Sequence, residues 1–334
     1  MTDDTAAAIG KPGSAAPKTV QPKKRKHGRT ACLLGIVIGL AGLVLGRMAA
    51  LRIEFDVFNQ FAWHFTLIAA AFFAGFFMPR ARVLVAVSLI IAGLLGNSIL
   101  PQMRAVRATN DFSLAGGARA LKIMSFNTWY DNTANQAIGD EIARQSPDVV
   151  MMVEFGEDKA TILQRFRQVY PYQHDCLTKS YCNLVILSKF PFSAPEARVG
   201  WEGPPMIRVK LGPEFGGLNI VGIHTIRFPH QRAQLRQIIA LSRLLESYPG
   251  PQIVMGDFNA TQFSRMLATF ESHTSLVRLT GYLPTWPARL KLPQIGIDQI
   301  YGSKGIYLLT EPRIGENAGS DHFPVIATVA IPVP

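Results

Sequence analysis

The sequence contains few cysteines and few charged residues. Three cysteines in 334 residues exclude a disulfide-dense scaffold, and no Cys or His pair has the spacing of a zinc site. Only 17% of the residues are charged and 48% are hydrophobic, which excludes a disordered chain. A glycine-rich nucleotide loop, a Gly-x-Ser-x-Gly elbow and internal repeats are also lacking. The length predicts about two domains with a sizeable core.

The formal net charge of +11 lies mostly in the first third of the chain. Residues 1–109 hold 13 Lys and Arg against 4 Asp and Glu, whereas residues 110–334 hold 21 against 19. A basic protein attracts nucleic acid through its phosphates, but here the C-terminal two thirds is nearly balanced. Nucleic acid is therefore the less favoured partner.

Three long stretches lack any formal charge, at 30–46, 57–78 and 83–103. A bilayer core needs about 20 mostly apolar residues, and the first stretch approaches this length if it extends past Arg47. The alternative for that stretch is a cleaved signal peptide, but two further apolar stretches follow directly. We expect a disordered basic cytoplasmic tail at 1–29 and a membrane anchor of three transmembrane helices at 30–103.

The distribution of Lys and Arg predicts the orientation of this anchor. Seven basic residues precede the first stretch, and Arg80 and Arg82 lie between the second and third. The positive-inside rule places both regions in the cytoplasm, so the C-terminal domain is expected on the extracytoplasmic or periplasmic face of the cytoplasmic (inner) membrane. In that oxidising compartment Cys176 and Cys182 could form a disulfide, or they could be two buried thiols.

The pattern changes after a linker at 104–117. From 118 to 334, short apolar runs of strand length alternate with amphipathic segments, which predicts an α/β domain. The expected strands are 121–126, 148–153, 184–188, 207–211, 218–224, 252–255, 296–301 and 323–331, and the expected helices are 134–145 and 230–248.

Polar residues with catalytic potential occur at the ends of these strands, and one lies inside a strand. They are Asn127, Glu154, His224, Asp257, Asn259, Asp298, Asp321 and His322. Strand ends hold side chains on a rigid backbone, and a carboxylate inside an apolar strand needs a partner to offset its desolvation. We expect these side chains to meet in one polar site.

The segments around these residues resemble a known superfamily. They read SFNTW at 125–129, DVVMMVE at 148–154, GIHT at 222–225, GDFNA at 256–260 and GSDHFP at 319–324. In this order they resemble the endonuclease/exonuclease/phosphatase (DNase I-like) superfamily. With the apolar N-terminal stretches, the chain is similar to its membrane-anchored branch, which includes teicoplanin-resistance-type proteins. The resemblance implies a two-sheet β-sandwich flanked by helices and preceded by three transmembrane helices.

The resemblance also implies a metal site. Glu154, Asn127 and Asp321 would hold Mg²⁺, or Mn²⁺ in its place. The oxygen ligands suit the chemistry, because Mg²⁺ prefers oxygen donors, keeps several waters and needs only one or two carboxylates from the protein.

The remaining candidates are assigned catalytic roles by the same resemblance. Asp257 would orient or deprotonate the attacking water and Asn259 would hold a phosphoryl oxygen; two positions apart on an extended backbone, they point the same way. His322 would contact phosphate and be held in its tautomer by Asp298. His224 would act near the leaving group. One departure from many relatives is Gln299, where those relatives have a histidine.

Together these features predict a membrane-anchored, Mg²⁺-dependent phosphoric ester hydrolase. Its expected partners are the lipid bilayer and a substrate that is a phosphate ester or diphosphate. Because the enzyme would be tethered at the outer face of the membrane, this substrate is expected to be lipid-linked. Two alternatives stay open: an extracytoplasmic nuclease, and a catalytically inactive resistance protein that binds a lipid intermediate.

Overall fold

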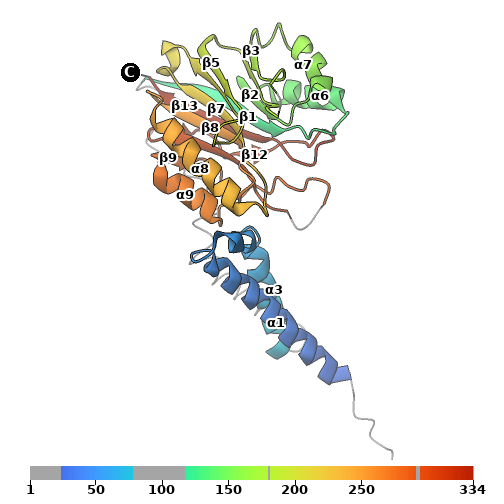
Figure 1. Ribbon diagram of the computed structural model, residues 1–334. Coiled ribbons are helices and arrows are strands. Elements are labelled where there is room, and N and C mark those ends of the chain that lie inside the picture. Colours follow the sequence, from blue (N-terminus) through green and yellow to red (C-terminus); the bar gives the residue numbers. More distant parts are fainter. Residues whose placement is uncertain (1–23, 78–116, 180, 291–293, 334) are drawn as a thin grey trace, which may run out of the picture.

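Two β-sheets pack face to face in the C-terminal domain, and a helical hairpin projects from it (Figure 1). The computed structural model describes residues 24–77, 117–179, 181–290 and 294–333. The two-sheet sandwich with flanking helices confirms the predicted fold of this domain.

The first sheet contains one parallel pair of strands, β1 with β2. Its strands, in order across the sheet, are β11 (Tyr307–Leu308), β13 (Val325–Pro332), β1 (Ala118–Asn127), β2 (Val149–Val153), β4 (Val185–Ser188) and β3 (Tyr172–Asp175), and β12 (Arg313–Ile314) also pairs with β13. All its other pairings are antiparallel.

The second sheet has the same feature, a single parallel pair formed by β7 and β8. Its strands, in order, are β5 (Phe192–Arg198), β6 (Met206–Leu211), β7 (Asn219–His224), β8 (Gln252–Asp257), β10 (Asp298–Ser303) and β9 (Leu276–Arg278). The carboxyl ends of both parallel pairs carry candidate site residues, because Asn127 ends β1 and His224 and Asp257 end β7 and β8.

Alternating side chains divide the interior into three apolar layers. Along β1, Leu121 and Ile123 face the second sheet, whereas Met124 and Phe126 face the helices α6 (Asn135–Gln145) and α7 (Ala160–Arg165). The second sheet packs in the same way against α8 and α9 (Gln231–Glu246 and Arg265–His273). The short helices η4 (Glu157–Lys159) and η5 (Pro213–Phe215) complete the domain. Both sheets are thus buried on two faces, which fixes the strand ends rigidly.

The hairpin consists of α1 (Lys24–Met48) packed antiparallel against α3 (Ala62–Phe77). Its turn contains η1 (Ile53–Phe55) and α2 (Asp56–Asn59). The two long helices approach closely, because a Cβ at Gly39 would lie 2.7 Å from the backbone nitrogen of Ala69. Small residues at such contacts are common between membrane helices.

The three predicted membrane helices are seen only in part. Among the described residues one helix, Thr30–Met48, is long and apolar enough to cross a membrane. A second candidate arises only if Ile53–Asn59 and Ala62–Phe76, bent by 57°, form one span. The predicted continuous helix at 57–78 is wrong at its start, because buried Asp56 and Gln60 bind the domain there. The predicted third span, 83–103, lies outside the described residues.

Of the two options for Cys176 and Cys182, the structure contains the disulfide, with their Cα atoms 5.7 Å apart. Both residues are buried at the edge of the layer between the sheets.

Candidate active site

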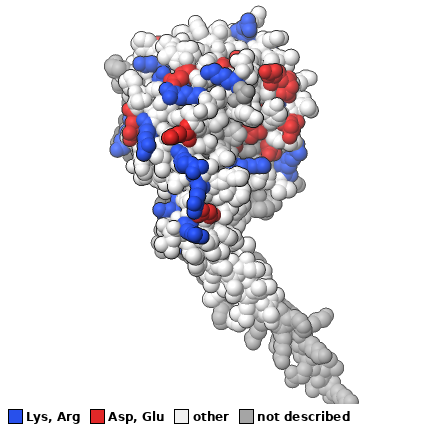
Figure 2. All heavy atoms as spheres, viewed as in Figure 1, with Lys and Arg blue, Asp and Glu red and all other residues white. Residues whose placement is uncertain are grey.

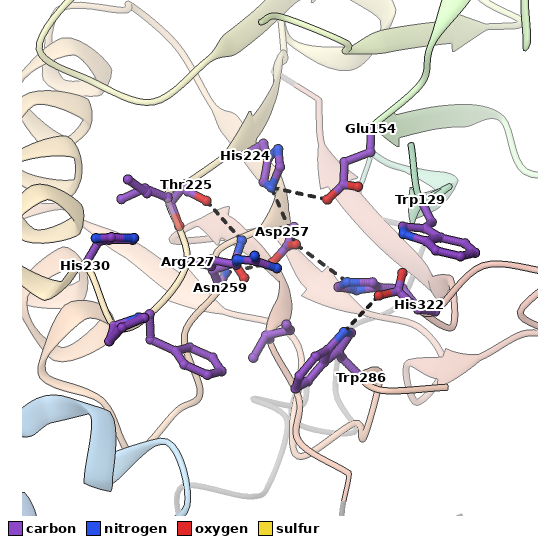
Figure 3. A pocket seen from close by; sticks show the side chains of 15 residues that line it. Trp129, Glu154, His224, Thr225, Arg227, His230, Asp257, Asn259, Trp286 and His322 are labelled. Atoms are coloured by element: carbon purple, nitrogen blue, oxygen red, sulfur yellow. Dashed lines mark hydrogen bonds and ion pairs between the residues drawn. The ribbon is translucent and has the colours of Figure 1, made fainter. Parts of the chain in front are cut away.

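The site forms where the carboxyl ends of the two parallel strand pairs meet. In the second sheet, Asp257 is the register partner of both His224 and Asp298, so three candidate residues lie side by side on adjacent strands. Asn127 and Glu154 reach the same place from the first sheet. Glu154, His224 and Asp257 line a pocket of about 620 Å³, shown in Figure 3.

Asn127 connects the two sheets at the base of the pocket. Its Nδ2 atom donates to Glu154 Oε1 at 2.9 Å and to Asp257 Oδ2 at 3.1 Å. Its Oδ1 atom accepts the backbone N–H of Trp129 at 2.9 Å. In this arrangement the amide orients two carboxylates, and its predicted role as a metal ligand stays a prediction.

Glu154 and His224 face each other across the pocket (Figure 3), with His224 Nε2 3.6 Å from Glu154 Oε1. Glu154 has a positive φ of 54°, a conformation that costs energy and clusters at functional sites. Burial raises the pKa of Glu154, but His224 and the amides of Asn127 and Tyr130 outweigh burial and lower it. Burial lowers the pKa of His224.

Asp257 lies between the two histidines, and its side chain is 2% exposed. Burial and the neighbouring carboxylate of Asp298 raise its pKa to about 8, against the opposing effect of His322. Asp257 Oδ1 accepts the backbone N–H of Asn259 at 2.7 Å, and Asn259 Nδ2 donates to the carbonyl of Thr225 at 3.0 Å. Asn259 also has a positive φ, of 46°. Asp257 can therefore exchange a proton near neutral pH.

His322 is held by Asp298, as the resemblance implied. Its Nδ1 atom lies 2.8 Å from Asp298 Oδ2, and its Nε2 atom lies 3.8 Å from Asp257 Oδ2. Burial alone would lower the pKa of His322, but Asp298 and the other carboxylates raise it to about 10. At neutral pH the ring is a cation that directs its Nε2–H toward the pocket.

Asp321 is the remaining predicted ligand. Its Oδ2 atom accepts the indole N–H of Trp286 at 3.1 Å, while its Oδ1 atom is buried and lacks a hydrogen-bond partner within the described structure. Such an atom needs a partner to offset its desolvation, and a cation would supply one. Asp321 as a metal ligand stays a prediction.

The donor set around the pocket fits a divalent cation. Two groups of side chains each place their ligand atoms within 4.8 Å of one another: Glu154, His224 and Asp257, and Asp257, Asp298 and His322. Carboxylate oxygens favour hard cations, and a dication there would offset the repulsion that raises the pKa of Asp257.

The structure brings all eight predicted residues together. Six line the pocket: Glu154, His224, Asp257, Asn259, Asp321 and His322. Asn127 and Asp298 contact these residues from behind. Gln299, the departure noted in the sequence, points elsewhere, because its amide donates to the carbonyls of Ala260 and Gly296.

The pocket also has an apolar wall, and none of its residues was among the predicted site residues. It includes Trp129, Ile226, Phe228, Trp286 and Ile297. Phe228 and Trp286 lie in irregular segments without periodicity or motif, so their sequence gives no sign that they line a site. The indole N–H of Trp286 reaches Asp321, which joins this wall to the polar cluster.

A two-sheet sandwich with carboxylates and histidines at the ends of its parallel strands is an arrangement suited to phosphate ester hydrolysis. The sequence profile of the Endonuclease/Exonuclease/phosphatase family matches residues 124–322, and the chain belongs to that family. Membership supports a hydrolase. The hairpin lies outside the matched residues.

Solved structures share this fold at low sequence identity. Humanized D. rerio TDP2 is similar with a TM-score of 0.54 and 16% identity over 63% of this chain and 98% of that chain. D. rerio TDP2 complexed with single strand DNA product gives 0.52 and 16% over the same shares. Sphingomyelinase C from Streptomyces griseocarneus gives 0.49 and 18% over 63% and 99%. No curated protein sequence matches the chain.

Proposed function

We propose that the chain is a membrane-anchored, Mg²⁺-dependent phosphoesterase that hydrolyses a lipid-linked phosphate ester or diphosphate at the outer face of the cytoplasmic membrane. The observation that carries the proposal is the apolar wall shared by the pocket and the hairpin. The ring of Phe228 lies 6.3 Å from Trp286 inside the pocket and 6.0 Å from Phe61 at the hairpin. An apolar path thus leads from the polar cluster to the anchor.

The hairpin surface supports insertion into a bilayer. Large apolar side chains of α1 are exposed along its length: Leu33, Leu34, Val37, Ile38, Leu40 and Val44. Soluble proteins rarely expose so continuous an apolar strip on their surface. In the face shown in Figure 2, the part of the hairpin between its junction with the domain and the grey atoms carries no Lys, Arg, Asp or Glu.

Two further observations support the outer face. The Cys176–Cys182 disulfide is typical of oxidising compartments. The seven Lys and Arg residues before the apolar stretch at 30–46 favour a cytoplasmic N-terminus.

In the proposed reaction the side chains have separate tasks. Asp257 holds the attacking water and accepts its proton as the bond to phosphorus forms. The cationic His322, oriented by Asp298, donates its Nε2–H to a phosphoryl oxygen and stabilises the developing charge. Asn259 contributes an amide N–H to the same group, and His224 lies at the side of the leaving oxygen. A divalent cation held by Glu154 and its neighbours would supply charge neutralisation.

A nuclease is the less favoured alternative. In the face shown in Figure 2, Lys and Arg are interspersed with Asp and Glu, and a DNA-binding groove favours a continuous basic stripe. The pocket wall is aromatic and aliphatic on the side that faces the hairpin.

The test compares substrates with the full-length protein in liposomes and Mg²⁺. A polyprenyl diphosphate, a phospholipid, a soluble phosphodiester and duplex DNA are offered in parallel. We expect hydrolysis of a lipid phosphate and a loss of about 100-fold or more in Glu154→Gln. The matched control is His273→Gln, an exposed histidine on α9.

A second variant tests the apolar wall. Phe228→Ala is expected to raise KM for the lipid substrate about tenfold, with little change for the soluble phosphodiester. Salt-sensitive cleavage of duplex DNA without action on lipid phosphates would instead favour the nuclease. A Glu154→Gln variant that keeps wild-type activity on both lipid phosphates and DNA would contradict the site assignment.

A further inference from the structure

The turn of the hairpin is buried against the loop that carries Asn259. The hairpin turn is defined here as residues 49–61, between α1 and α3, and the catalytic loop as residues 258–264, between β8 and α9. Figure 3 shows the hairpin as the blue ribbon beside the pocket. Two polar side chains of the hairpin turn, Asp56 and Gln60, are 0% exposed, which is unusual for such residues unless they are hydrogen-bonded.

Both side chains accept backbone N–H groups from the other segment. Gln60 Oε1 accepts from Thr261 at 2.7 Å, and Asp56 Oδ1 accepts from Arg265 at 2.8 Å. These bonds join residues 201 and 209 positions apart in the chain. A buried amide that loses its acceptor is costly, so the hairpin turn contributes to the order of the catalytic loop.

Asp56 also adds to the start of α9. Ser264, the residue before that helix, caps it, because its Oγ accepts the N–H of Leu267. Asp56 Oδ1 accepts the N–H of Arg265, the first residue of the helix. The helix that follows the catalytic loop thus begins on a side chain of the anchor.

The catalytic loop connects these contacts directly to the chemistry. Thr261 lies two residues after Asn259, whose N–H binds Asp257 Oδ1 at 2.7 Å. On the opposite side, Gln234 of α8 donates to the carbonyls of Phe258 and Asn259 at 3.0 and 3.1 Å. The strained backbone of Asn259 is therefore held from two directions, one of which is the hairpin.

The hairpin turn is itself fixed. Asn59 Nδ2 donates to Asp56 Oδ1 at 2.8 Å and to the carbonyl of Gly46 at 3.1 Å, which ties the turn to the end of α1. Glu54 pairs with Arg232 of α8 at an exposed position.

We propose that Asp56 and Gln60 are positioning residues for the active site, and that the hairpin completes the catalytic loop as well as anchoring the protein. Where it concerns catalysis, the inference rests on the proposed function. The hairpin turn sets the position of Asn259 and Asp257 relative to the histidines, and small displacements of such groups slow a reaction strongly.

The first measurement is independent of activity. Hydrogen exchange of peptides that cover residues 258–266 is followed in the full-length protein in detergent. Asp56→Ala and Gln60→Leu are expected to accelerate exchange there about tenfold or more. Asp56→Asn, which retains the Oδ1 acceptor, and Glu54→Gln, which disrupts only the exposed pair, are expected to leave it near the wild-type rate.

The second measurement is hydrolysis of a soluble phosphodiester, bis(p-nitrophenyl) phosphate, which avoids any effect on lipid access. Asp56→Ala and Gln60→Leu are expected to lower kcat about 10- to 100-fold with little change in KM. Asp56→Asn is expected to retain most of the wild-type kcat. If Asp56 and Gln60 had a purely structural role, Asp56→Ala and Gln60→Leu would lower the thermal midpoint but leave kcat of the folded protein unchanged.

Each outcome distinguishes the two proposals. If the protein is active and exchange is unchanged in both Asp56→Ala and Gln60→Leu, this inference is overturned and the proposed function is not. Faster exchange with a wild-type kcat would overturn the positioning role. If the wild-type protein hydrolyses no phosphate substrate but the variants still show faster exchange, the proposed function is overturned. The role of the hairpin turn in ordering the catalytic loop then stands.

Discussion

His322 and Asp298 form a buried ion pair whose energetics depend on pH. The pKa of His322 is raised from 6.5 to about 10, so the folded state binds the proton more tightly than the unfolded state. Stabilisation from this proton is fully present below pH 6.5 and is lost as pH rises through about 10. The raised pKa of Asp257 acts in the same direction at lower pH.

We therefore predict that the thermal midpoint of the full-length protein in EDTA falls as pH rises from 7 to 10. Asp298→Asn removes the carboxylate that raises both pKa values, so its midpoint should be lower at pH 7 and fall less steeply. Differential scanning fluorimetry of both proteins checks this. Parallel curves for the two proteins would contradict the assigned role of Asp298.

The polar residues of the site could be predicted from sequence because they lie at or near the ends of apolar strands, with Asp298 at the start of β10 and Asp321 and His322 just before β13. Asn127, Glu154 and Asp257 stand out in this way, and the amide of Asn127 joins the other two in the structure. Phe228 and Trp286 could not be predicted, since apolar residues in loops have many uses. Only the tertiary structure brings them to the pocket.

At the level of elements, close contact between β7 and β8 requires glycine. A Cβ at Gly256 would lie 2.1 Å from the carbonyl oxygen of Ile223, and its φ is +141°. Because Gly256 precedes Asp257, a shift of β8 at this point would displace the catalytic carboxylate.

Gly256→Ala is predicted to lower the free energy of unfolding by about 3 kcal/mol or more, through combined strain and overpacking. The control is Gly200→Ala, which has a φ of +69° but no atom within 4 Å of the added Cβ. It should cost about 1 kcal/mol. Urea denaturation of both variants measures the difference, and equal losses would exclude the steric explanation.

The central strands were predictable because they are buried and apolar, as in β2 with VVMMV and β8 with QIVMGD. The missed strands β3 and β5 are polar edge strands, with sequences YQHD and FSAPEAR, and pairing rather than hydrophobicity defines them. Helix α9 was also missed, although Ser264 followed by Met266, Leu267 and Phe270 was a usable start signal.

At the level of the whole molecule, the hairpin constrains the path of the chain. Its turn contacts the domain, and α3 runs away from the domain toward Phe77 (Figure 1). The described part of the C-terminal domain begins at residue 117. In the proposed topology the hairpin turn and the domain lie on the same side of the bilayer, and the span predicted at 83–103, which lies outside the described residues, stays a prediction.

Alkaline phosphatase fusions test this topology. With a cytoplasmic N-terminus, fusions after residues 54 and 334 are predicted to be active, whereas a fusion after residue 81 should be inactive. Fluorescent protein fusions at the same positions should give the opposite pattern. An inactive fusion after residue 334 with normal expression would exclude an extracytoplasmic domain.

The docked hairpin turn also determines how the enzyme would meet its substrate. In the proposed membrane-anchored protein, the hydrogen bonds of Gln60 and Asp56 to Thr261 and Arg265 would hold the pocket at one height and one tilt above the bilayer. Encounters would then take place in two dimensions, so turnover would follow the mole fraction of substrate in the membrane. Adding inert lipid at a constant total amount of substrate would slow the reaction, although the bulk concentration had not changed.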